Sequence, residues 1–174
     1  ITPVNLQSPG FGISNLSAVA ASQAGAFIAV QTPGQFEFAL HYLAANGQTR
    51  WQRRFTASSD PKVAADATTA CTSFTASEQI ELHCFDIASN QVVFGSVEAA
   101  PTHTQFGTAT WLVNDLAVVN GFVTRTLKRG HFIEDQMRFQ GFERNGTKRF
   151  EQTIERFLGL SVLNETGFTV ASFG

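Results

Sequence analysis

An internal repeat constrains the fold of this 174-residue chain more than any other feature of its sequence. Three segments read as an alternating strand, a tight turn and a second alternating strand: Phe36–Phe55, Gln79–Val97 and Gln136–Ile154. Their turns contain Asn46-Gly47, Asn90-Gln91 and Asn145-Gly146. Asn-Gly is typical of a type I′ hairpin turn, because both central residues of that turn have a positive φ.

A further pair of short strands is expected before each hairpin. These pairs are Ser17–Ser22 with Ala26–Thr32, Lys62–Ala67 with Ala70–Ala76, and Thr108–Val113 with Leu116–Arg125. The sequence therefore predicts an all-β fold of four-stranded antiparallel units at 13–55, 62–97 and 108–154, with half of a fourth unit at 158–174. The chain 1–174 is interpreted as a single domain or a fragment. Residues Lys128–Asp135 are charged and predict a long surface loop inserted in the third unit.

Composition agrees with strands and excludes two classes of partner. The chain has 17 Phe against one Tyr and two Trp, and aromatic residues favour strands. Its net charge of −2 argues against nucleic acid. The longest apolar run is too short to span a membrane. The chain begins at Ile1, which suggests a processed or excised product.

Four strands in about 45 residues is the spacing of a β-propeller blade. The segment Leu43–Trp51 reads L-x-x-N-G-x-x-x-W and resembles the outer hairpin of quinoprotein-like and related bacterial propeller repeats. Phe94 and Phe150 stand near the position of Trp51 in the other two units. The resemblance implies a propeller or part of one, and a β-sandwich or jelly roll is the alternative.

Three and a half units do not close a ring of at least four blades. We therefore expect either a fragment completed by a second chain, or two copies that pair into one ring, or a closed sandwich.

Cys71 and Cys84 become directly opposed if a two-residue turn at Ser77-Glu78 joins their strands. This predicts a disulfide and, with it, an oxidising compartment, secreted or periplasmic. Two buried free thiols are the alternative. A metal site with His83 is disfavoured, because neighbouring strand residues point to opposite faces. His41 and His83 occupy the same repeat position and are expected to be structural.

No nucleophile elbow, phosphate loop or zinc motif is present, so the sequence predicts no catalytic residue, no cofactor and no metal. Glu134-Asp135 is interpreted as a solvated pair. Three N-x-[ST] sequons predict glycosylation of a secreted protein, at Asn15, Asn145 and Asn164.

The leading hypothesis is a non-catalytic module that binds a protein or glycan partner through its loops. The candidate ligand-binding residues are Tyr42, Trp51, Trp111 and Arg125, because aromatic rings stack on sugars and because Trp and Arg dominate protein interfaces. Two alternatives stay open: a subunit of a propeller enzyme whose active site lies on another chain, and a structural coat or fimbrial subunit.

Overall fold

The computed structural model describes residues 16–22, 25–31, 36–99, 104–112, 118–128, 131–155, 161–164 and 167–170. Every regular element in this part of the chain is a β-strand, and every paired strand is antiparallel. The predicted all-β class is therefore confirmed. The described residues contain no helix long and apolar enough to cross a lipid bilayer.

Twelve of the strands form three four-stranded meanders, in which each strand pairs with the next along the chain. The first sheet contains β1 (Leu16–Ser22), β2 (Gly25–Gln31), β3 (Glu37–Ala44) and β4 (Thr49–Thr56). The second contains β5 (Lys62–Ala65), β6 (Thr69–Ala76), β7 (Gln79–Asp86) and β8 (Val92–Ala99). The third contains β9 (Thr104–Trp111), β10 (Val118–Lys128), β11 (His131–Phe142) and β12 (Lys148–Glu155). A two-stranded sheet follows, made of β13 (Ser161–Asn164) and β14 (Gly167–Val170).

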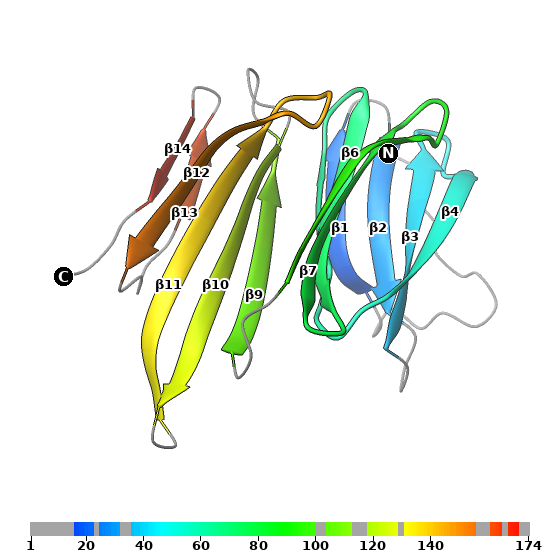
Figure 1. Ribbon diagram of the computed structural model, residues 1–174. Coiled ribbons are helices and arrows are strands. Elements are labelled where there is room, and N and C mark those ends of the chain that lie inside the picture. The colour runs from blue at the N-terminus through cyan, green and yellow to red at the C-terminus, as the bar shows by residue number, and fades with distance from the viewer. Residues whose placement is uncertain are drawn as a thin grey trace.

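The three large sheets stand face to face like the leaves of a fan (Figure 1). Their first strands lie next to one another, since β1 contacts β5 and β5 contacts β9. The last strands, β4, β8 and β12, each pair on one side only. In the described part of the chain the sheets do not close into a ring.

The outer hairpins use a wider turn than the sequence predicts. The amide of Gly47 donates to the carbonyl of Ala44 at 2.8 Å, and Gly47 has a φ of 81° whereas Asn46 is not in the left-handed region. The turn before β12 repeats this geometry at Gly146, with a φ of 86°. The expected type I′ turn at Asn-Gly is therefore wrong: a three-residue loop ends in a left-handed glycine, which forms a β-bulge.

In the second sheet Asn90 takes the left-handed position, with a φ of 58°. Its amide donates to the carbonyl of Asp86 at 2.9 Å, so this loop is one residue longer than the other two. Asn90 thus corresponds to Gly47, and the expected alignment of Asn90 with Asn46 is shifted by one residue. The two-residue turn at Ser77-Glu78 is confirmed, with φ values of 45° and 64° as a type I′ turn requires.

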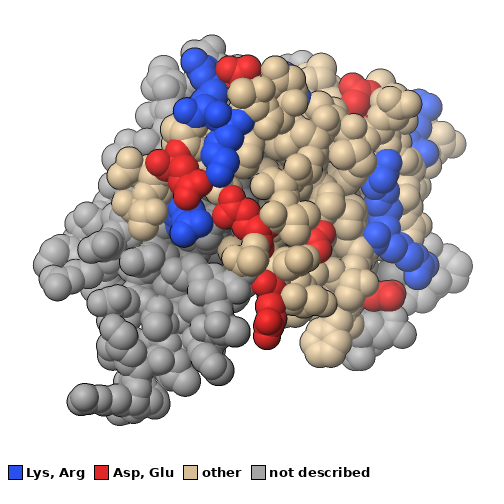
Figure 2. All heavy atoms as spheres, in the orientation of Figure 1, with Lys and Arg blue, Asp and Glu red and all other residues tan. Residues whose placement is uncertain are grey.

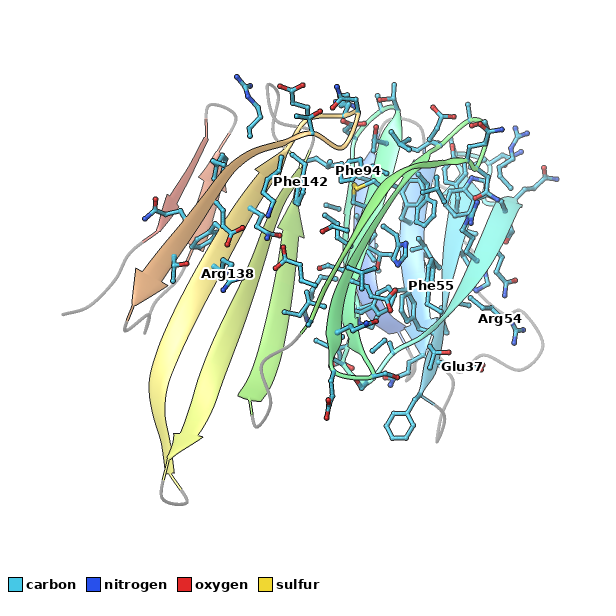
Figure 3. The ribbon with its side chains drawn as sticks, in the orientation of Figure 1. Glu37, Arg54, Phe55, Phe94, Arg138 and Phe142 are labelled. Carbon is cyan, nitrogen blue, oxygen red and sulfur yellow. A yellow bond between two sulfur atoms is a disulfide. The ribbon has the colours of Figure 1, made fainter. Side chains whose placement is uncertain are left out.

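An aromatic core joins the first sheet to the second. Phe27 and Phe38 from the first sheet and Phe74 and Phe85 from the second are at most 1% exposed. The rings of Phe38 and Phe74 meet edge to face, with centroids 5.0 Å apart. Phe55 points into the same core, whereas the neighbouring Arg54 points away from the second sheet (Figure 3). Burying rings of 150–250 Å² each makes this contact the main source of cohesion between the two sheets.

A second core joins the second sheet to the third. It contains the disulfide between Cys71 and Cys84, which are directly opposed in β6 and β7 with Cα atoms 4.1 Å apart. Phe94 of β8 faces Phe142 of β11 across this interface, with ring centroids 5.6 Å apart (Figure 3). The predicted disulfide is therefore confirmed. Because the second sheet is covered on both sides, all eight residues of β6 are buried.

The predicted surface loop at Lys128–Asp135 is wrong. The strands β10 and β11 continue through most of this segment, and Glu134 and Asp135 pair with Thr126 and Arg125 inside the ladder. A β-bulge between Thr126 and Leu127 adjusts the register. The extra residues lengthen a hairpin because alternating strand pairing satisfies their backbone groups better than an open loop does.

Candidate functional site

A groove of about 840 Å³ opens where the first and second sheets meet at one end. Three turns form its rim: the turn between β3 and β4, the turn between β5 and β6, and the turn between β7 and β8. The lining residues are Tyr42, Ala44, Ala45, Asn46, Arg50, Trp51, Ala67, Thr68, Asp86, Ile87 and Ala88. Loops held by a rigid double layer are where binding sites usually lie.

The floor of the groove is aromatic. Tyr42 stacks on Phe27 with centroids 4.8 Å apart and ring planes 9° apart, and Trp51 lies tilted against Tyr42 at 5.8 Å. The indole Nε1 of Trp51 donates to the carbonyl of Ile87 at 3.1 Å. Tyr42 is 8% exposed and Trp51 is half-buried, so both rings belong to the core and present only an edge to the groove.

Two aspartates shape the polar side of the rim. Asp86 accepts hydrogen bonds on Oδ1 from the hydroxyl and the amide of Ser89, both at 2.7 Å, and these lower the pKa of the Asp86 carboxyl. Asp66 accepts the amides of Thr68 and Thr69 at 2.8 Å each, which closes the turn before β6. Turns capped by a carboxylate are rigid, because the side chain replaces a backbone acceptor.

Arg144 of the third sheet reaches the same rim. Its Nη2 lies 2.6 Å from Oδ2 of Asp66, and its Nη1 donates to the hydroxyls of Thr68 and Thr69. Burial alone would raise the pKa of Asp66, but the bonds from Arg144, Thr68 and Thr69 outweigh it and hold the pKa below its ordinary value. The turn is therefore fixed from both neighbouring sheets.

Among the described residues that line the groove, Arg50 is the one Lys or Arg, and it has no ion pair with another described residue. It is exposed, and with Arg53 and Arg54 it makes β4 the most basic strand of the first sheet. In Figure 2 these side chains form a blue strip along the outer edge of that sheet. Arg53 is engaged, since its Nε donates to Oδ1 of Asn90 at 2.8 Å. Arg50 therefore remains the cation available to a ligand.

The structure brings together two of the four predicted ligand-binding residues, Tyr42 and Trp51. Trp111 and Arg125 lie in the third sheet, where they pair with Val119 and Gln105 of neighbouring strands. Their side chains lie outside the described part of the structure, and a binding role for any of the four stays a prediction. The groove also includes Asn46, Arg50, Thr68 and Asp86, which sequence reasoning did not select. Asp86 could have been selected from the sequence, because an aspartate followed three residues later by a serine, Ser89, is typical of a turn in which the carboxylate accepts hydrogen bonds.

Glycosylation stays a prediction. Asn145 is exposed in the turn before β12, where its Oδ1 accepts the amide of Thr147 at 2.9 Å. Asn15 lies outside the described residues, and Asn164 is the last residue of β13, with its side chain undescribed.

His83 lies on the opposite face of the second sheet from the disulfide. Its ring stacks on Phe74 at 5.7 Å, and its Nε2 lies 2.7 Å from Oε2 of Glu81. His41 holds the equivalent register, because it pairs with Gln52 of β4 as His83 pairs with Gly95 of β8. No three His, Cys, Asp or Glu side chains among the described residues are grouped to hold a metal ion.

No protein-family model matches the sequence, and no curated protein matches it.

Proposed function

We propose that this chain is a non-catalytic binding module of an exported, propeller-type repeat protein. The observation that carries the proposal is the groove between the first two sheets, which combines an aromatic floor with a polar rim built on rigid turns. A concave site with a few convergent polar groups is the usual form of a binding site.

Two features support the propeller-type architecture and the exported origin. Three four-stranded meanders stand side by side with their first strands adjacent, which is the arrangement of successive blades. The disulfide between Cys71 and Cys84 favours an oxidising compartment, because thiols stay reduced in the cytosol.

An oligosaccharide is the ligand class that the groove suits best. Aromatic edges offer apolar contact to the C–H face of a sugar, and amide, carboxylate and guanidinium groups bond its hydroxyls. Asn46, Arg50 and Asp86 supply these three kinds of group within one rim. An extended peptide would use the same aromatic floor and forms the alternative outcome of the test.

The test is a glycan and peptide array, followed by calorimetric titration of any ligand found. Arg50→Ala and Asn46→Ala should each weaken binding about threefold to tenfold, because each removes a polar contact worth about 1 kcal/mol. Arg149→Ala is the matched control, since Arg149 is an exposed strand arginine of the third sheet, paired with Glu143 at 3.5 Å. Binding that these rim variants leave unchanged would place the site elsewhere, and an array without any ligand would contradict the proposal.

A further inference from the structure

The three outer strands of the fan differ in how they protect their free edges. The strand β4 carries Arg50, Arg53 and Arg54. The strand β12 carries Lys148, Arg149 and Glu151. The strand β8 reads VVFGSVEA and has no charged residue before Glu98. Charged side chains are a common device against pairing between sheet edges. The first and third sheets use that device, and the second does not.

The unprotected edge is also apolar. Val92, Val93 and Val97 are 51%, 39% and 54% exposed, and they make up three of the five large hydrophobic residues that are exposed in the described structure. Figure 2 shows Lys and Arg in two groups, one on either side of the second sheet. The strand β8 pairs only with β7. Every second residue of β8 therefore directs its backbone amide and carbonyl to the other edge, where no partner strand lies among the described residues.

We propose that β8 is an interface at which two copies of this chain pair edge to edge, antiparallel, about a two-fold axis. An axis at Gly95 places Val93 of one copy opposite Val97 of the other, on one face of the joined sheet. Cross-strand pairs of β-branched residues stabilise such a ladder. Gly95 stands at the crossing point, where the absence of a side chain lets the two backbones approach closely.

A second copy fits this edge better than an unrelated strand. A two-fold axis at Gly95 pairs each residue before position 95 in one copy with the residue equally far after position 95 in the other. In β8 this arrangement sets Glu98 against Val92, and no two like charges meet. The same operation on β4 about Gln52 would set Arg50 against Arg54, which is repulsive. The pattern of charge therefore permits self-pairing on the second sheet and opposes it on the first.

The test is sedimentation velocity over a wide concentration range. We expect a monomer–dimer equilibrium, which Val97→Lys should shift by at least about tenfold toward monomer, because both symmetry-related apolar pairs are lost and two ammonium groups are desolvated. The new side chain lies across from Glu81, so the monomer keeps its fold, which circular dichroism checks. Gln52→Lys on β4 is the matched control, with the same charge change on an exposed strand residue, and it should leave the dimer intact.

The register is tested with the double variant Val93→Cys/Val97→Cys. Under mild oxidation it should give a covalent dimer. Chymotrypsin, which cleaves after Phe94, separates the two positions, and the chymotryptic peptides should link position 93 of one copy to position 97 of the other. A wild-type monomer at every concentration would overturn the proposal. So would a dimer that Val97→Lys leaves unchanged, or pull-down of an unrelated protein through β8 without self-association. None of these outcomes bears on ligand binding in the groove, so the two proposals stand or fall separately.

Discussion

The indole Nε1 of Trp51 donates to the carbonyl oxygen of Ile87 at 3.1 Å, and this bond joins the outer strand of the first sheet to the last turn of the second. Phe94 holds the same register in the second sheet and packs on Phe142 of the third, where it also contacts Gly146. In both β4 and β8 an aromatic side chain thus packs against the turn of the next sheet, and of these two only Trp51 adds a hydrogen bond.

Trp51→Phe should therefore lower the free energy of unfolding by about 1–2 kcal/mol, because the ring stays and the carbonyl of Ile87 loses its donor. Trp51→Ala removes the ring as well and should cost about 3–5 kcal/mol. Urea unfolding measures both. Gln52→Ala, on the exposed face of the same strand, should change stability little, and equal losses in all three variants would contradict the assignment.

The disulfide should make a large contribution to stability. Cys71 and Cys84 are separated by 13 positions, and closing a loop of that size stabilises a protein by about 3 kcal/mol. Both cysteines are fully buried, so the double variant Cys71→Ala/Cys84→Ala should lose at least that much while keeping apolar side chains in the core. Denaturant unfolding of the variant and of the oxidised protein gives the comparison. An unchanged midpoint of the unfolding transition would show that the disulfide does not stabilise the folded protein.

The contact between Asp66 and Arg144 should give stability a defined pH dependence. Because the folded-state pKa of Asp66 is below its ordinary value of 3.8, the stabilisation is complete above that value. It is lost as the pH falls through the lower, folded-state pKa. Asp66→Asn should therefore cost about 1–2 kcal/mol near pH 7, with allowance for the partly exposed site, and progressively less as the pH falls below 3.8.

A double-mutant cycle with Arg144→Gln isolates this contact. The coupling energy between the two positions should decline over the same acidic range. A cost of Asp66→Asn that does not vary with pH would assign the effect to the turn geometry and not to the charge.

Asn90 has a left-handed backbone, and two substitutions there distinguish the cost of backbone strain from the cost of a lost side-chain hydrogen bond. Asn90→Gly keeps the φ of 58° available and loses only the bond from Arg53 Nε to the side-chain Oδ1, at a cost of about 1 kcal/mol, whereas Arg53 Nη2 still donates to the backbone carbonyl of residue 90. Asn90→Ala loses the same bond and adds about 1 kcal/mol of left-handed strain. Ala88 in the same turn is the control, because its φ is not positive, so that Ala88→Gly should not stabilise the protein. Thermal unfolding should rank glycine above alanine at position 90.

The sequence allowed the strands and the disulfide to be predicted because both depend on local pattern. Alternation along β6 and β7 and the turn at Ser77-Glu78 fix the register that opposes Cys71 to Cys84. The groove depends on contacts between units, such as that of Trp51 with Ile87, 36 residues away, and no local pattern encodes that pairing. The equivalence of Asn90 with Gly47 was missed because a loop one residue longer shifts the left-handed position.

The central claim, a binding groove between the first two sheets, is tested most directly by mapping amide and indole resonances. The protein labelled with ¹⁵N is titrated with each oligosaccharide or peptide that the array identifies. The account predicts shifts of the Trp51 indole N–H and of the amides at 44–46, 67–68 and 86–88, which line one groove. Shifts confined to other surfaces, or none at ligand concentrations that saturate binding, would contradict it.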